Sequence, residues 1–93
     1  MKITKQFDVN CSEATIRIDV SEIKEEVAWK ILDELRKKFD SSINQDIFES
    51  EVDMGFVFGK RIITIKGDYP HNNKATITKV LDEKKLKYEY EGE

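Results

Sequence analysis

The sequence has few of the residues on which common functional sites depend. Its 93 residues include one cysteine, one histidine, one proline and four glycines. The single cysteine, Cys11, excludes an intramolecular disulfide and predicts a reducing, cytoplasmic environment. No paired Cys or His spacing suits a zinc site, and the glycines form no phosphate-binding motif. We therefore expect no metal, no cofactor and no enzymatic activity.

Long hydrophobic runs are also absent. No stretch is long enough to cross a bilayer as a helix, and residues 1–6 lack the apolar core of a secretory signal. The composition is 39% hydrophobic and 38% charged. These proportions predict one soluble domain over residues 1–93, with a heavily charged surface and no membrane contact.

Charge is unevenly distributed along the chain, although the net charge is only −3. Residues 39–59 contain five acids and no base, namely Asp40, Asp46, Glu49, Glu51 and Asp53. These acids lack the ligand order of a calcium-binding loop. Residues 60–87 contain eight bases against three acids. Either acidic and basic strands pair within one sheet, or separate charged zones orient a partner.

Alternating apolar residues predict strands over residues 2–11 and 14–20. A short polar connection between them suits an antiparallel pair. Alternation returns from Val52 to Phe58, and Gly59–Lys60 is expected to form the two-residue turn of a second hairpin. This register places Asp53 opposite Lys66, which would explain why an acidic segment precedes a basic one.

One long amphipathic helix is predicted from Ser21 to Phe39. Its apolar residues follow the i, i+3, i+4 spacing and are Ile23, Val27, Ala28, Ile31, Leu32, Leu35 and Phe39. They share one face at about 100° per residue. Asp19 or Ser21 is the expected N-cap, since Asp19 also has Glu22 at the spacing of a capping box.

Residues 74–91 allow two interpretations. One is a second, shorter helix over Lys74–Leu86, with Ile77, Val80 and Leu81 on its inner side. The other is a hairpin with strands Lys74–Leu81 and Lys85–Glu91, which we favour because Thr and Val residues there are β-branched. The predicted architecture is α+β, with an antiparallel sheet of about five or six strands and the long helix packed on one face.

Trp29 is the residue that most strongly suggests a function. It lies among the charged residues of the predicted helix and away from the apolar face. Either another part of the chain covers it, or it anchors a protein partner, a role in which Trp is enriched. The predicted partner-binding residues are Trp29, Glu22, Glu25, Asp33, Arg36 and, in a loop, Tyr69.

His71 and Cys11 are weaker candidates for chemistry. Catalysis by histidine needs an orienting acid and a reacting group nearby, and Asp68 is the single acid close in sequence. Cys11 lies on the apolar side of its predicted strand, where a small buried residue is expected. An enzyme or small-ligand carrier that uses His71 is therefore the third hypothesis.

Two segments resemble a known family. Residues 35–39, Leu-Arg-Lys-Lys-Phe, and residues 63–68, Ile-Thr-Ile-Lys-Gly-Asp, are similar to part of the small translation-initiation factors that monitor start-codon pairing. This chain lacks the basic, glycine-rich hairpin of that family. The resemblance implies an RNA- or ribosome-associated domain, and no individual residue is carried over from that family. The basic residues that such a domain would offer here are Lys60, Arg61, Lys66, Lys74 and Lys79.

The leading hypothesis is a small protein-binding module of the inhibitor, immunity or adaptor type, either a monomer or a homodimer. It depends on the absence of catalytic motifs, on the segregated charge and on Trp29. The RNA-associated domain is the alternative. An acidic overall balance counts against it, because phosphate neutralisation requires a basic footprint.

Overall fold

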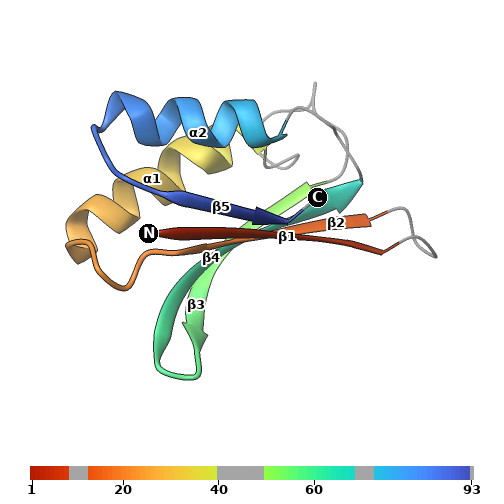
Figure 1. Cartoon of the computed structure of the whole chain (residues 1–93), viewed down its shortest axis with the longest axis horizontal. Helices are drawn as coiled ribbons and strands as arrows, with labels where there is room; N and C mark the ends of the chain where they lie inside the picture. The colour runs from red at the N-terminus through yellow and green to blue at the C-terminus, as the bar shows by residue number, and fades with distance from the viewer. Residues whose placement is uncertain (9–12, 40–49, 69–72, 93) are drawn as a thin grey trace.

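The structure is a computed structural model, and it describes residues 1–8, 13–39, 50–68 and 73–92. In chain order its elements are β1 (Lys2–Asp8), β2 (Glu13–Asp19), α1 (Glu25–Phe39), β3 (Ser50–Val57), β4 (Lys60–Asp68), α2 (Asn73–Glu83) and β5 (Glu89–Gly92). The strands form one mixed sheet in the order β3-β4-β2-β1-β5. β1 and β5 are parallel, and the other neighbours are antiparallel. The α+β class is as predicted, but two helices cover the sheet (Figure 1).

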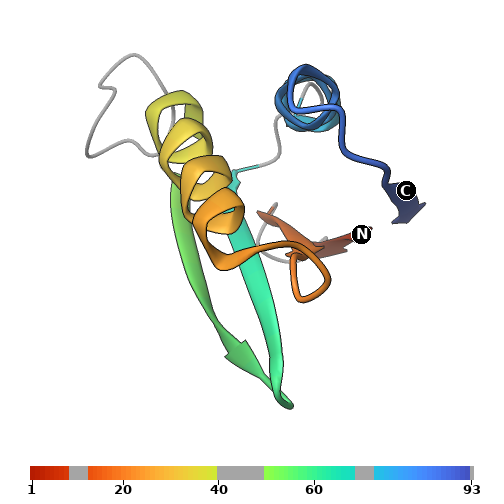
Figure 2. The ribbon, with the colours of Figure 1, turned by 90° about the vertical axis from the view of Figure 1, so that its left-hand side faces the viewer.

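Both helices lie on the same face of the sheet, α1 over the β3 side and α2 over the β5 side (Figure 2). α1 joins β2 to β3, and α2 joins β4 to β5; the strands in each pair run parallel to each other. Such connections are crossovers and are almost always right-handed. Because β2 and β4 run in opposite directions and their crossovers lead to opposite edges, a common handedness places both helices on one face.

The core lies between the helices and the covered face of the sheet. The most deeply buried strand residues are Ile3, Ile16, Ile18, Val52, Ile63 and Ile65, and their helical counterparts are Ile31, Leu32, Leu35, Ile77, Val80 and Leu81. Lys84, just after α2, lies 2.8 Å from the Oε1 of Glu34 on α1, and both side chains are partly buried. This ion pair joins the C-terminal end of α2 to α1.

The favoured hairpin over residues 74–91 is wrong, because α2 is a helix. Ile77, Val80 and Leu81 are buried at the i, i+3, i+4 spacing of the alternative interpretation. A β-branched residue lowers helix stability by less than about 0.7 kcal/mol, whereas burial of one large aliphatic side chain gains about 1.5–3 kcal/mol. Packing therefore outweighs local propensity here. The final strand is shorter than predicted, since it begins at Glu89.

α1 begins at Glu25, four residues after the predicted start at Ser21. The carbonyl of Lys24 accepts the first helical hydrogen bond, from Ala28 at 3.0 Å. The predicted caps are used elsewhere. Asp19 Oδ1 accepts a hydrogen bond from the Ser21 N–H at 2.9 Å, and the Ser21 hydroxyl oxygen accepts one from the Arg61 N–H at 2.9 Å. The turn before α1 is thus attached to β4.

Asp19 has a lowered pKa within this turn. Burial acts to raise the pKa of its carboxyl, but hydrogen bonds from the Ser21 side chain and backbone, and then the positive charge of Lys60, outweigh this effect. The resulting pKa lies below the ordinary value of 3.8. A carboxylate of this kind stabilises the folded state as long as it remains ionised.

We expect Asp19→Asn, which keeps an oxygen acceptor but removes the charge, to lower the free energy of unfolding at neutral pH by up to about 1 kcal/mol. The stabilisation by Asp19 is complete above the unfolded pKa, near pH 4, and is lost as the pH falls through the lowered folded pKa. Urea unfolding of both proteins should therefore show a difference at pH 7 that narrows toward pH 2.5. A difference that is constant over this range would contradict the assignment.

Candidate binding surface

The β3–β4 hairpin turns at Phe58 and Gly59. Val57 pairs with Lys60, so the loop consists of Phe58 and Gly59 alone. Both have positive φ, 51° at Phe58 and 77° at Gly59. Two successive residues of positive φ define a type I′ turn, whose twist matches that of the flanking strands.

The predicted turn at Gly59–Lys60 is therefore one position too late, and the register of the hairpin changes by two residues. Glu51, and not Asp53, lies opposite Lys66. Because side chains alternate with a period of two, this shift leaves each one on its predicted face of the sheet. The pairing of the acidic strand with the basic strand is retained.

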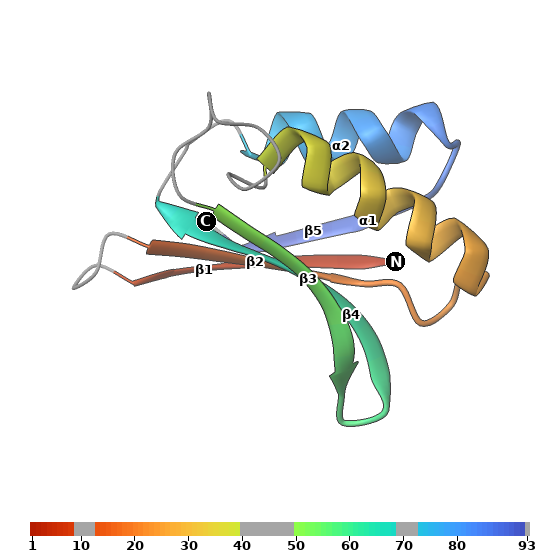
Figure 3. The ribbon, with the colours of Figure 1, turned by 180° about the vertical axis from the view of Figure 1, so that it is seen from behind.

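Exposure of the apolar residues increases along β3 toward the turn. Val52 is buried, Met54 is half-buried, Phe56 is 71% exposed and Phe58 is fully exposed. The hairpin curves away from both helices, and its tip projects on the side opposite to them (Figure 3). The apolar alternation of β3 thus begins in the core and ends in solvent.

Phe58 is unfavourably placed in two respects. Its φ of 51° lies in the left-handed region, where an aromatic residue is uncommon and where the backbone costs about 1–2 kcal/mol. Its side chain gains no burial in return. Asn or Gly would satisfy the same turn without this cost. Such a residue is a candidate for function, because strain of this kind accumulates at binding sites.

Trp29 on α1 is connected to the hairpin by a series of contacts. The Trp29 Nε1–H donates to Glu25 Oε1 at 3.4 Å, and Glu25 Oε2 lies 3.8 Å from Arg61 Nη2. The Arg61 guanidinium carbon is 5.3 Å from the centre of the Phe56 ring, which is within the range of a cation–π contact. A helix residue and a hairpin residue thus belong to one surface.

We call this region the apolar tip surface and define it as Trp29, Phe56, Val57 and Phe58. These are the exposed large hydrophobic residues found in the described ranges, with exposed fractions from 47% for Val57 upward. Isolated exposed hydrophobic residues are common on soluble proteins, whereas a contiguous group marks an interaction site. Three of these residues are consecutive at the tip of one hairpin; Phe56 lies on the helix-facing side of β3, and Val57 lies on the opposite side.

Arg36 connects the C-terminal half of α1 to β3. Its Nε–H donates to the Val52 carbonyl at 3.1 Å, and its Nη2 lies 3.7 Å from Asp53 Oδ1. The guanidinium therefore reaches around the free edge of the sheet. Asp33, on the same side of the helix, pairs with Lys37 at 3.0 Å.

The structure brings together only part of the predicted partner-binding set. Glu25, Trp29 and Arg36 all lie along the side of α1 that borders the hairpin. Glu22 is separate from them because it precedes the helix, and its carboxylate lies 3.9 Å from the Met1 amino group. Tyr69 lies outside the described residues, as do Cys11, His71, Asp40, Asp46 and Glu49.

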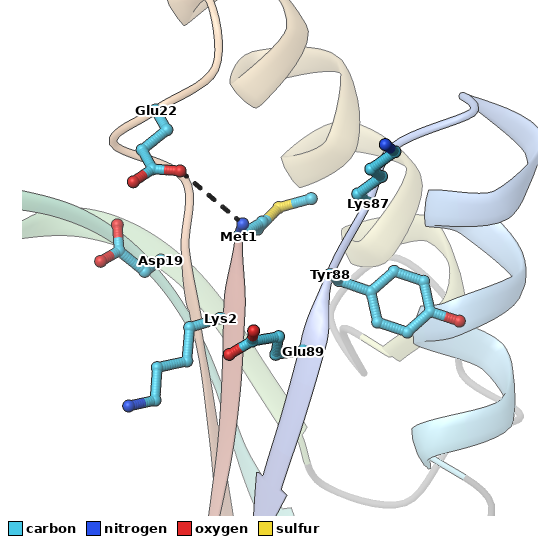
Figure 4. A pocket seen from close by; sticks show the side chains of 7 residues that line it. All are labelled: Met1, Lys2, Asp19, Glu22, Lys87, Tyr88 and Glu89. Atoms are coloured by element: carbon cyan, nitrogen blue, oxygen red, sulfur yellow. Dashed lines mark ion pairs between the residues drawn. The ribbon is translucent and has the colours of Figure 1, made fainter.

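A hollow of about 560 Å³ lies beside the N-terminus, between the turn that precedes α1 and the start of β5 (Figure 4). It is lined by Met1, Lys2, Asp19, Glu22, Lys87, Tyr88 and Glu89. In Figure 4 the Tyr88 ring points toward the helices, and Glu22 faces the Met1 amino group. Within the described ranges no three His, Cys, Asp or Glu residues are placed to hold a metal ion. The hollow therefore presents scattered charges of both signs and no convergent polar set.

The basic residues proposed for RNA do not form one stripe. Lys60 and Arg61 lie at the tip of the hairpin, and Lys66 lies near the other end of β4. Lys74 and Lys79 belong to α2, which covers the β5 side of the sheet (Figure 2). The Arg61 guanidinium is also engaged by Glu25. A nucleic-acid backbone would need these charges along one continuous path.

Comparison with protein-family models, curated proteins and solved structures found no significant match. The resemblance of residues 35–39 and 63–68 to small translation-initiation factors thus gains no support from these comparisons. No helix in the described parts of the chain is long and apolar enough to cross a membrane.

The sequence analysis missed Phe56 and Phe58 as members of an exposed surface, and it assigned Arg61 only to the RNA-associated alternative. Simple alternation assigned both phenylalanines to the core. One available signal was the position of Phe58 next to Gly59. When the apolar alternation of a strand continues into its turn, the last apolar residues lie past the part of the strand that a helix can cover, and they are therefore expected to be exposed. The helical wheel did indicate Trp29, because it depends on residues within α1 alone.

Replacement of Phe58 by Asn should stabilise the fold by about 1 kcal/mol, because Asn tolerates positive φ and no buried contact is lost. Gly59→Ala should destabilise it by about 1 kcal/mol, although the added methyl group would meet no atom within 4 Å. Thermal or urea unfolding measures both. A less stable Phe58→Asn protein would show that Phe58 supports the hairpin.

Proposed function

We propose that this chain is a protein-binding module and that the apolar tip surface is its docking site. The proposal is supported by the exposure of Phe58 despite its unfavourable backbone conformation. The two residues before it, Phe56 and Val57, are also exposed and apolar. Burial of one phenylalanine in a partner would contribute about 1.5–3 kcal/mol. Trp29 and Arg61 add the residue types that most often dominate binding energies.

A protein partner fits this surface better than a lipid membrane. Phe56 and Phe58 resemble the apolar residues by which hairpins enter the interface of a bilayer. Glu25 lies beside them and Glu51 and Asp53 lie along the same hairpin. These carboxylates would approach an anionic lipid surface together with the phenylalanines and would be repelled by it. A protein interface tolerates both signs of charge around an apolar centre.

The partner would therefore present an apolar pocket for the hairpin tip, bordered by polar groups for Glu25 and Arg61. Glu25 and Arg61 lie 3.8 Å apart, and the Glu25 and Arg61 side chains are 65% and 20% exposed, respectively. A pair at the rim of an interface fixes orientation more than it increases affinity. Inhibitor, immunity and adaptor proteins all belong to this class of module.

The test is capture from native cell extract followed by measurement with the purified captured protein. We expect Trp29→Ala and Phe58→Asn each to weaken that purified interaction at least tenfold, because each removes an aromatic anchor. Phe58→Asn is the more informative variant, since it should be more stable than the parent protein. A loss of binding in that variant is not explained by unfolding.

Lys79→Ala is the matched control, because Lys79 is exposed and belongs to α2, the helix that covers the β5 side of the sheet (Figure 2). It should bind the partner as tightly as the parent protein. The proposal fails if the captured protein binds Phe58→Asn and Trp29→Ala unchanged. Capture that nuclease abolishes and that weakens steeply with salt would instead establish the RNA-associated alternative.

A further inference from the structure

β3 is an edge strand, and the hydrogen bonds of β4 show which of its backbone groups point outward. The Arg61 N–H donates to the Ser21 hydroxyl oxygen at 2.9 Å, and the Arg61 carbonyl accepts from the Val20 N–H at 3.0 Å. Both groups of Arg61 therefore point away from β3. In an antiparallel pair, the residue opposite also points its groups away from the ladder. That residue is Phe56.

The same orientation recurs at every second residue of β3. The Val52 carbonyl confirms it independently, since it accepts a hydrogen bond from Arg36 and so faces the free edge. Met54 lies between Val52 and Phe56 and has the same orientation. No hydrogen bond within the described ranges reaches the outward N–H or C=O of Met54 or Phe56. Among the described residues, the edge is thus occupied by Arg36 at Val52, and the backbone groups of Met54 and Phe56 have no partner there.

We infer that an extended segment of the protein partner adds to this edge as a sixth strand, next to Met54 and Phe56. The inference rests on the proposed function and assigns a binding mode to it. Strand addition uses main-chain hydrogen bonds for affinity and alternate side chains for specificity. The Met54 and Phe56 backbones offer two donors and two acceptors to such a segment.

Side chains on the helix-facing side of the added strand would meet an apolar wall. Phe56 and the half-buried Met54 line this side of β3. Trp29 is positioned above it, because Glu25 contacts the hairpin near Phe56 and Arg36 contacts it at Val52, at opposite ends of this stretch. Trp29 lies between them on α1. Apolar residues are therefore expected at alternate positions of the partner segment.

On the opposite side of β3, basic residues are expected in the partner segment. Glu51 and Asp53 project there and are both exposed, and the Asp53 side chain is 76% exposed with Arg36 at 3.7 Å. The occupant is thus an extended segment that alternates apolar with Lys or Arg side chains. A second copy of this chain fits less well, because its own β3 would bring two more carboxylates to the shared edge.

The experiment uses linear peptides selected from a random display library on the immobilised full chain. Met54→Pro removes an outward N–H that β4 does not use, a substitution that edge strands tolerate. Met54→Ala is the matched control, because it loses the same side chain and retains the N–H. We expect Met54→Pro to weaken the selected peptides at least tenfold relative to Met54→Ala, and urea unfolding to show both variants folded.

A second measurement does not alter the protein. Methylation of single peptide amides should abolish binding at every second position, since only alternate amides of an added strand face β3. Selected sequences should alternate apolar and basic residues. An absence of enriched peptides, or binding that Met54→Pro and amide methylation leave unchanged, would overturn strand addition.

These results also distinguish the inference from the proposed function. Peptides that lose affinity with Trp29→Ala and Phe58→Asn, but not with Met54→Pro, would retain the apolar tip surface and exclude strand addition. Dimerisation of the chain in sedimentation analysis, abolished by Met54→Pro, would identify a second copy as the occupant and contradict the assignment of a foreign segment.

Discussion

The two-residue turn at Phe58 and Gly59 determines most of what is distinctive about this molecule. Because both residues have positive φ, the strands pair directly from Val57 and Lys60 onward, and no bulge adjusts the register. That register directs the backbone groups of Val52, Met54 and Phe56 to the free edge. It also carries Phe56 and Phe58 beyond the end of α1. The exposed aromatic rings and the open edge therefore have the same structural origin.

The faces of the strands could be predicted from the sequence, but the turn could not. Alternation has a period of two, so an error of one position in the turn moved the pairing by two residues and left the inward and outward sides correct. Gly59 tolerates positive φ and was correctly placed in the turn, but its neighbour was misjudged. Phe58 is an unusual residue for that position, and no propensity favours it there. Local rules thus fail at the residue for which a function is proposed.

The two helices show how tertiary context overrides local preference. β4 and β5 run parallel and have β2 and β1 between them, so the connection must cross over the sheet to reach the far edge. Ile77, Val80 and Leu81 gain burial only in the helical conformation. Similarly, Ser21 was a good cap by residue type, yet its hydroxyl oxygen accepts a hydrogen bond from Arg61 on a strand 40 positions away in sequence. Contacts of this range leave no signal in a single sequence.

The free edge of β3 combines protection and exposure. Edge strands invite unwanted pairing, and proteins commonly block them with charged side chains. Arg36 provides such a block at Val52 and Asp53, and its attachment to both a carbonyl and a carboxylate holds it there. Among the described residues no hydrogen bond to a charged side chain covers the outward backbone groups of Met54 or Phe56, and the Arg61 guanidinium contacts the Phe56 ring instead. If the edge served only the stability of the fold, the same protection would be expected along its whole length. An edge that is blocked at one half and apolar at the other fits the proposed strand addition better. In that proposal Arg36 limits how many residues of the partner strand can pair with β3. Trp29 and Phe56 determine which side chains that strand carries.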